Sequence, residues 1–187
     1  MFARILLLGA LLTGVAVQPA ASQSKETVAW DKVGGWHIGV DRTMDNACFA
    51  QMTYQGGTSL RVGLDLKHET LYFVIINGAW TPVEAGKVYP VFVVFEDRKS
   101  HEVSLGAFTL GTKAALGNGG VSADFIRDFR ESTSLRVVHR GFSIVHLQLR
   151  DANAAIARIT DCQEAMQAAE GTSAVGPPPA AEREFSF

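Results

Sequence analysis

The sequence has few of the residues on which several protein classes depend. Its 187 residues include only two cysteines, which excludes a disulfide-dense mini-protein and a zinc site with four thiolate ligands. It carries 17 basic and 19 acidic side chains, a net charge of -2, so no basic field is present to hold a polyanion. We therefore expect no nucleic-acid partner. With 47% hydrophobic and 19% charged residues, the composition is that of a folded globular protein, and the length fits one domain.

The familiar catalytic and cofactor signatures are missing as well. No H-E-x-x-H zinc motif and no G-x-S-x-G nucleophile elbow occurs, and the glycine-rich segment 117–120 lacks the lysine of a phosphate-binding loop. Asp124, Asp128 and Glu131 recur at helical spacing, and we interpret them as a solvated helix face. The sequence thus predicts no catalytic residue, no metal site and no cofactor, and we hypothesise that the protein is not an enzyme.

The first 22 residues have the features of a secretory signal peptide. Arg4 precedes an uncharged apolar run, 5–17, and the small residues 20–22 supply a cleavage site before Gln23. Thirteen residues rise about 20 Å as a helix, which is short of the ~30 Å hydrocarbon core of a bilayer. We therefore expect export rather than anchoring, and no transmembrane segment in the mature chain.

The two cysteines are expected to pair in an oxidising compartment. Cys48 and Cys162 are both kept in the mature chain, and an even cysteine count in an exported protein indicates a disulfide. The alternative is a reactive thiol, but the C-x-x-C spacing of redox pairs is absent.

Short apolar runs separated by glycine and polar turns predict an antiparallel β protein. The clearest is the period-2 segment 60–66, and 71–76 is apolar throughout, as expected for a strand buried on both faces. The eight expected strands span 36–40, 48–54, 60–66, 71–76, 88–95, 103–110, 135–139 and 142–149, the last two forming a hairpin around Arg140-Gly141.

Two helices complete the predicted fold. Ser122 is typical of an N-cap and starts a short helix that reaches about Ser132. A final helix after Asp151 has one apolar stripe, formed by Ala155, Ile156, Ile159, Cys162 and Met166. The predicted fold is mainly β: an antiparallel sheet or β-sandwich of about eight strands, with a short inserted helix and a C-terminal amphipathic helix packed on it. A bond between Cys48 and Cys162 would staple that helix to an early strand.

The expected organisation has four parts. The signal peptide, 1–22, precedes a flexible N-terminus, 23–29, and a single β-rich domain, 30–169. Residues 170–187 lack apolar periodicity and contain three consecutive prolines, which predicts a disordered Pro/Ala-rich tail. Its final Phe185-Ser186-Phe187 is either an unselected end or a ligand for a periplasmic PDZ-type domain.

Histidines and tryptophans were considered as site residues. His37, His68, His101, His139 and His146 are expected at surfaces or edges; His139 and His146 share a hairpin face, ~13 Å apart and too far for one metal. Trp30, Trp36 and Trp80 fall at strand ends or turns, where a tryptophan either caps the core or anchors a partner.

Two segments carry a resemblance to a known family. Cys48-Phe49-Ala50-Gln51, and the stretch 144–149 followed by Ala154-Ala155-Ile156 and Cys162, resemble small periplasmic proteins of alpha-proteobacteria. Among named families, the chain is similar to the invasion-associated locus B proteins. The resemblance implies a periplasmic, sandwich-like protein without assigned chemistry, and it transfers no functional residue.

Three functions remain open from the sequence. The first is a non-enzymatic periplasmic domain that binds another envelope component, protein or glycan, through its exposed edge strands. The second is a small exported hydrolase with a dispersed site, which predicts a histidine beside a carboxylate in a polar cleft. The third is an inhibitor of a cell-wall enzyme, for which the charged loops 41–46 or 97–102 could serve.

Overall fold

One antiparallel sheet of ten strands forms the body of the protein. The computed structural model describes residues 26–80, 83–96 and 99–173. The strands are β1 (Thr27–Val33), β2 (Trp36–Asp41), β3 (Ala47–Thr53), β4 (Ser59–Asp65), β5 (Thr70–Asn77), β6 (Val88–Phe95), β7 (Lys99–Leu110), β8 (Lys113–Asn118), β9 (Ser134–His139) and β10 (Phe142–Gln148). Two α-helices, α1 (Ala123–Glu131) and α2 (Ala152–Ser173), and a short 3-10 helix, η1 (Arg42–Met44), accompany them. The predicted mainly β fold with an inserted and a C-terminal helix is confirmed.

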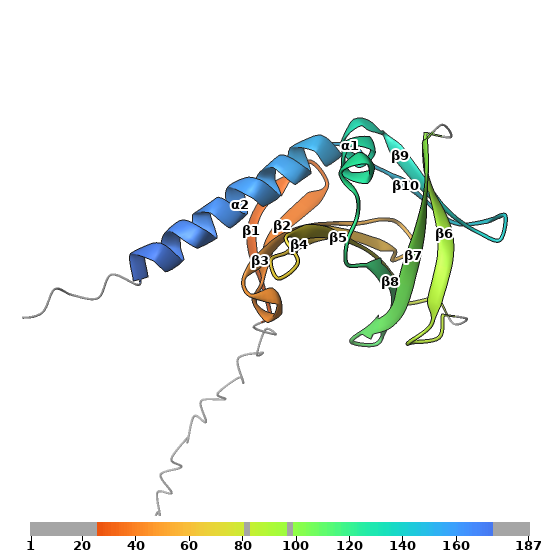
Figure 1. The fold of residues 1–187 in the computed structure, drawn as a ribbon, viewed down its shortest axis with the longest axis horizontal. Helices are drawn as coiled ribbons and strands as arrows, with labels where there is room; N and C mark the ends of the chain where they lie inside the picture. Colours follow the sequence, from red (N-terminus) through yellow and green to blue (C-terminus); the bar gives the residue numbers. More distant parts are fainter. Residues whose placement is uncertain (1–25, 81–82, 97–98, 174–187) are drawn as a thin grey trace, which may run out of the picture.

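The strands are not arranged entirely in sequence order. The order across the sheet is β1-β2-β3-β4-β5-β8-β7-β6-β9-β10, so the first five strands form a meander and the next three run back in reverse. After β8 the chain forms α1 and then returns to pair β9 with β6. Figure 1 shows the sheet curving so that its β1–β5 half and its β6–β10 half face the same interior.

The main core lies inside this curve, and α1 closes it with two aromatic rings. Phe125 and Phe129 are buried; the Phe125 ring lies 5.4 Å from the ring of Phe73 and 5.2 Å from that of Phe95, and Phe129 lies 6.0 Å from Trp36. All three contacts are edge-to-face, an arrangement that aromatic pairs favour. Because these rings come from both halves of the sheet, α1 joins the two halves.

The predicted cap of α1 is present. The Ser122 hydroxyl accepts a hydrogen bond from the Phe125 amide at 3.1 Å, and Asp124 places a negative charge in the first turn. The helix ends at Glu131, with Ser132 as its C-cap. The predicted limits at Ser122 and Ser132 are therefore confirmed.

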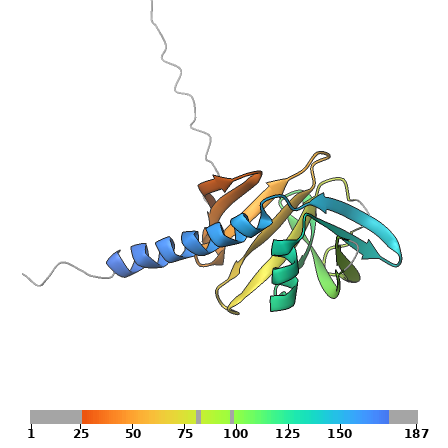
Figure 2. The ribbon, with the colours of Figure 1, turned by 90° about the horizontal axis from the view of Figure 1, so that it is seen from above.

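Helix α2 packs across β1, β2 and β3 on the same side as the core. Its predicted stripe is buried except for Met166, which is half-buried. The indole Nε1 of Trp36 donates to the Arg150 carbonyl oxygen at 2.8 Å and so fixes the start of the helix. Figure 2 shows that the C-terminal part of α2 extends beyond the sheet.

The structure differs from the sequence prediction at the two ends of the domain and in the middle. Strand β1 begins at Thr27, so residues 27–29 belong to the sheet rather than to a flexible N-terminus. Helix α2 continues to Ser173, past the expected start of the tail at 170. Strand β8 was not predicted, because its segment reads as loose small residues. The predicted signal peptide, 1–22, and the rest of the predicted tail, 174–187, with its final Phe185-Ser186-Phe187, lie outside the described residues.

Candidate functional site

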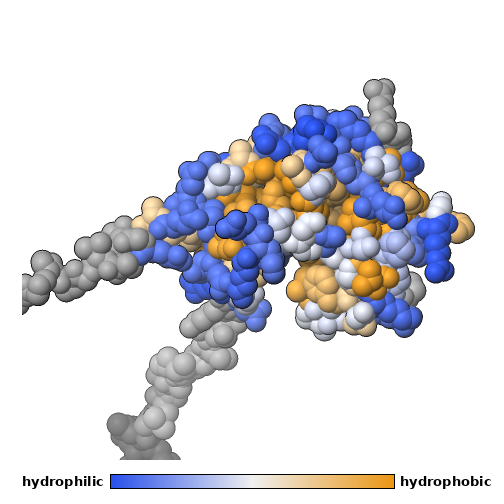
Figure 3. Space-filling view, in the orientation of Figure 1, coloured by the Kyte–Doolittle hydropathy of each residue, from blue (hydrophilic) through white to orange (hydrophobic). Residues whose placement is uncertain are grey.

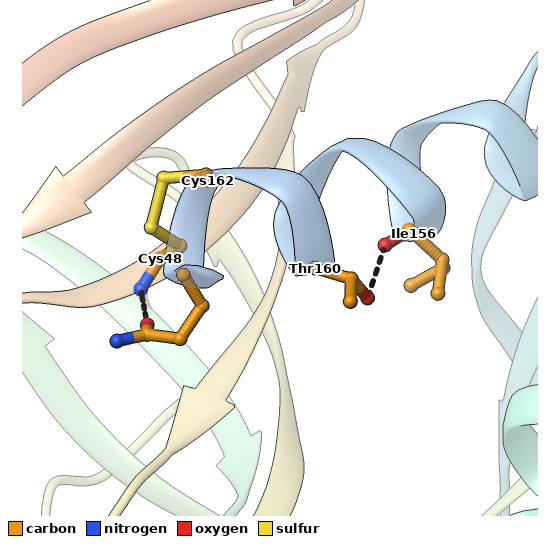
Figure 4. The surroundings of a disulfide bond; sticks show 5 residues. Cys48, Ile156, Thr160 and Cys162 are labelled. Carbon is orange, nitrogen blue, oxygen red and sulfur yellow. Dashed lines mark hydrogen bonds between the residues drawn. A yellow bond between two sulfur atoms is a disulfide. The ribbon is translucent and has the colours of Figure 1, made fainter. Parts of the chain in front are cut away.

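A disulfide links Cys48 on β3 to Cys162 on α2. The two Cα atoms are 6.1 Å apart, both side chains are fully buried, and 114 positions separate them in the sequence. Figure 4 shows the bond joining the helix to the strand below it. The expected pairing and its role as a staple between helix and sheet are confirmed.

A second contact supports the staple. The Cys48 amide donates to the Gln163 side-chain oxygen at 2.9 Å, and this bond is buried. Figure 4 shows this bond next to the disulfide, on the same turn of α2. The backbone of β3 is therefore held by a covalent and a polar link to neighbouring residues of one helix. This region has a structural role.

A buried carboxylate on α1 gathers positive groups from β7. Asp128 is 3% exposed; its two oxygens accept from Lys99 Nζ and from His101 Nε2, each at 2.8 Å. The hydrogen bond from Lys99 is the main reason why the pKa of Asp128 falls to about 2, with the His101 bond adding to it. The interpretation of Asp128 as part of a solvated helix face was wrong, although Asp124 and Glu131 are exposed.

The pair of His101 and Asp128 is the histidine-carboxylate arrangement that the hydrolase hypothesis requires. Its geometry points to a structural role, because the carboxylate also binds Lys99 and the imidazole lies edge-on to the rings of Phe95 and Phe125. Among the described residues, the hydrogen bonds of His101 lead to Asp128, and no hydroxyl or thiol is bonded to the ring. The cluster clamps α1 onto β7.

The other histidines lie apart from one another. His68 is exposed and pairs with Asp65 at 2.7 Å, and the Nδ1 of His139 donates to the Pro90 carbonyl at 2.8 Å. The pairing of β9 with β10 shifts between Ser143 and Val145, which places His146 opposite Arg136 rather than Leu135. The expectation that His139 and His146 share a face was therefore wrong, since Arg136 and His139 alternate across the sheet.

The three tryptophans all contact the main core. Trp36 is fully buried at the start of β2, and Trp80 is half-buried against the core. Trp30 lies within β1, not at a strand end, and the Arg158 guanidinium sits 4.9 Å above its ring. Core capping therefore accounts for Trp36, and α2 partly covers Trp30.

One hollow lies beside α1. It is a groove of about 900 Å³, and its lining includes an apolar floor and a charged rim (Leu64, Leu71, Val121 and Ile126; Glu69, Arg127, Arg130 and Glu131). Arg127 pairs with Asp124 at 2.7 Å, and Arg130 donates to Asn153 at 2.7 Å. Figure 3 shows a hydrophobic band across the middle of the face in view. Because the rim carries two acidic and two basic side chains, its charges favour neither an anionic nor a cationic ligand.

The two edges of the sheet are treated differently. At one edge, Asp31 of β1 accepts from the Arg158 guanidinium of α2, with Nε at 2.9 Å, and α2 contacts the strand. The hydrogen bond from Arg158 lowers the pKa of Asp31. Strand β1 also carries charged side chains, which discourage pairing with another chain. This edge is protected.

Strand β10 forms the other edge, and it lacks this protection. Its sequence, FSIVHLQ, contains no acidic residue, lysine, arginine or proline, and Phe142 and Ile144 are 77% and 38% exposed. Within the described part of the chain, β10 pairs with β9 on one side and with no strand on the other. One register shift interrupts it. The outer edge of β10 is the candidate interaction surface.

The segments considered as loops of an enzyme inhibitor are 41–46 and 97–102. The Asp41 carboxylate is buried and accepts from the Thr43 amide, the Thr43 hydroxyl and Arg61, so the 41–46 segment is tied to the sheet. Of the other segment, 97–98 lie outside the described residues and 99–102 belong to β7. Charged side chains of both segments are exposed, namely Arg42, Asp45, Lys99 and Glu102, and the inhibitor hypothesis stays a prediction.

The fold defines a class: in its described part, the chain is a β protein with a single curved sheet and a disulfide that joins the C-terminal helix to that sheet. Among the described residues no helix is both long and apolar enough to cross a membrane. No protein-family model and no curated protein matches the sequence. Among solved structures, the chain is similar to invasion associated protein B from Bartonella henselae, with a TM-score of 0.55 over 72% of this chain and 97% of that chain, at 14% sequence identity. At the level of the fold, this confirms the resemblance indicated by the sequence.

Proposed function

We propose that this chain is an exported, non-enzymatic domain of the periplasm that binds another envelope protein by adding one of that protein's strands to β10. The observation that carries the proposal is the contrast between the two sheet edges: β1 is charged and tied to α2, whereas β10 is uncharged and open. An open edge presents unpaired backbone groups to an extended segment of another chain.

Side chains beside this edge can supply selectivity. In strand addition, main-chain hydrogen bonds give affinity and alternate side chains give specificity. Phe142 and Ile144 lie at the start of β10, and His146 and Gln148 follow on its exposed positions. The register shift at Ser143–Val145 interrupts the regular edge, so the partner strand would pair most regularly with 145–148.

Location in the periplasm is part of the proposal. The predicted leader, 1–22, would deliver the chain there, and a disulfide persists in that compartment. The binding role is favoured over a catalytic one because the buried histidine-carboxylate pair clamps α1 to β7, and the second pair, His68 with Asp65, is an exposed contact between residues three positions apart.

A photo-crosslinking amino acid at position 144 tests the proposal in intact cells. The matched control places the same amino acid at Val28 of β1, because Val28 and Ile144 are 39% and 38% exposed on the opposite edges. We expect an adduct with another envelope protein from position 144 and none from position 28. An Ile144→Lys exchange beside a crosslinker at 142 should abolish the adduct.

Two outcomes would argue against the proposal, and a third would identify the partner. No adduct at 144, or equal adducts at both positions, would refute binding at β10. An adduct of twice the protein's own mass would show self-association instead. If the adduct contains a cell-wall hydrolase, and Ile144→Lys relieves its inhibition, the partner is an enzyme and the protein is its inhibitor.

A further inference from the structure

The outer face of the sheet, on the side away from the main core, carries a second set of packed side chains. Phe49, Tyr72, Val74, Ile76 and Ala115 form a cluster of their own there. Two hollows of about 230 and 310 Å³ lie on this face, the first across β1–β4 and the second from η1 and β4 across to β7. Arg61 lines both hollows, so they are adjacent, and we call the two together the outer groove.

Because glycines lie opposite the aromatic residues of this groove, the aromatic rings can lie close to the sheet. Gly39 on β2 pairs with Phe49 on β3, and Gly63 on β4 lies between Phe49 and Tyr72. A Cβ added at Gly63 would lie 2.5 Å from the Tyr72 ring, and one added at Gly39 would lie 2.8 Å from the Phe49 ring. The rings therefore lie over the glycines, close to the sheet. Phe108, 36% exposed, continues the aromatic lining over Gly117.

A row of polar side chains runs beside the aromatic ones. His37, Gln51 and Arg61 are opposite one another on β2, β3 and β4. The Arg61 guanidinium lies 4.0 Å above the Phe49 ring and donates to Gln51 at 2.9 Å and to Asp41 at 3.2 Å. Because Phe49 and Tyr72 are buried, the exposed ring of the groove is that of Phe108, and beside it lie planar groups that donate and accept hydrogen bonds.

The charges of the outer groove balance. Arg61 is neutralised by Asp41, and Asp31 at the β1 end is neutralised by Arg158. Its remaining lining is uncharged apart from His37, and it includes hydroxyl and amide groups from Thr27, Thr43, Gln51, Thr53 and Asn118. A polyanion would require a surplus of cations, which this lining lacks.

From this balance we infer that the outer groove binds an uncharged, hydroxyl-rich glycan chain. Sugar hydroxyls both donate and accept hydrogen bonds, which suits the planar polar row, and the apolar face of a sugar ring suits the exposed ring of Phe108. The groove extends over seven neighbouring strands, β1 to β7 in sheet order, or about 29 Å at the usual strand spacing. That length fits an oligosaccharide rather than a single sugar. This site is separate from β10.

Titration of the full mature protein with neutral tetrasaccharides tests the inference. The probes are β-1,4-linked tetramers of glucose and of N-acetylglucosamine, and a tetragalacturonate is the anionic comparison. Binding is measured by calorimetry and by amide chemical shifts. We expect at least one neutral tetramer to bind, with shifts at 51, 61 and 108, and the galacturonate to bind more weakly.

Variants locate the binding. Phe108→Ala and Gln51→Ala should each weaken the affinity about tenfold, the effect of losing one well-packed contact. Phe92→Ala is the matched control, because Phe92 is also an exposed phenylalanine, 48% exposed, but lies on β6 outside the groove. Ile144→Lys should bind the tetramer like the parent protein, which keeps this test independent of β10.

Three results would overturn the inference. These are no binding of either neutral tetramer, preferential binding of the galacturonate, and binding that neither Phe108→Ala nor Gln51→Ala weakens. Thermal unfolding of each variant shows that a lost affinity comes from the groove and not from a lost fold.

Discussion

Removing the disulfide between Cys48 and Cys162 should cost much of the stability of the domain. The bond closes a loop spanning 114 positions. In the chain-entropy account, a cross-link over such a loop stabilises the folded state by about 4.8 kcal/mol at 25 °C, near the upper end of measured values. Since whole domains are stable by only about 5–15 kcal/mol, this bond accounts for a large share of the total.

The assay compares oxidised and reduced protein of the same sequence. The disulfide is fully buried, so it is reduced in urea and the protein is then refolded with reductant. Urea unfolding is followed by the fluorescence of buried Trp36 and by circular dichroism. We expect the reduced form to lose about 4–5 kcal/mol of unfolding free energy, or to remain unfolded.

Two controls separate the cross-link from local packing. Cys48→Ala with Cys162→Ala should lose slightly more than reduction does, because two buried sulfur atoms are also removed. Gln167→Ala, exposed on the same helix, should change stability by less than about 0.5 kcal/mol. A loss below ~1 kcal/mol on reduction would refute the reasoning, as would mass spectrometry that finds both thiols free in protein taken from cells.

Three further predictions concern single groups. Gln163→Leu leaves the buried Cys48 amide without its acceptor and should cost about 1–3 kcal/mol by urea unfolding, whereas Gln167→Leu should cost little. Because the pKa of Asp128 is lower in the folded protein than in the unfolded chain, its carboxylate stabilises the fold above about pH 4, and this stabilisation is lost as the pH falls towards 2. Between these pH values, Asp128→Asn should therefore lose less unfolding free energy than the parent protein does. Protein recovered from the periplasm should begin at Gln23 by intact mass; a chain that keeps residues 1–22 would contradict the predicted cleavage.

Local patterns predicted the elements whose burial follows their own sequence. The alternation in 60–66 corresponds to β4, where Leu60 and Val62 are buried while Arg61 lies on the outer face. The apolar run 71–76 corresponds to β5, which is buried on both faces from Tyr72 onward. The hairpin around Arg140-Gly141 was also correct, because both turn residues adopt the positive φ that such a tight turn requires.

Elements whose formation depends on neighbouring strands could not be predicted from their own sequence patterns. Strand β8, KAALGN, is rich in small residues with little preference for strands, but Ala115 and Gly117 fit beside Phe108 and Val74 of adjacent strands. Strand β1 contains charged residues because it is an edge. The reversed order β8-β7-β6 cannot be predicted from the sequence of any single segment, since it depends on which strands pair after folding.

The site residues, too, could be predicted only where their own local sequence was informative. The sequence indicated the disulfide, because a predicted signal peptide and an even cysteine count are enough to suggest it. It could not indicate that Asp128 is buried, because its partners Lys99 and His101 are 29 and 27 positions away and on a different element. Nor could it show that Arg61 joins two hollows, which depends on the pairing of β2, β3 and β4.

The disulfide also determines which sheet edge stays open. Helix α2 starts at Ala152, directly after β10 ends at Gln148, and could in principle fold back over β10. The bond from Cys162 to β3, with Arg158 on Asp31, holds it across β1–β3 instead. Reduction should therefore release α2 from β1 and break the contact of Arg158 with Asp31, so that the reduced protein self-associates through the β1 edge while the oxidised protein does not. Light scattering of both forms, with Asp31→Ala in the oxidised background, distinguishes this from simple unfolding: if the edge argument holds, that variant associates while its circular dichroism stays native.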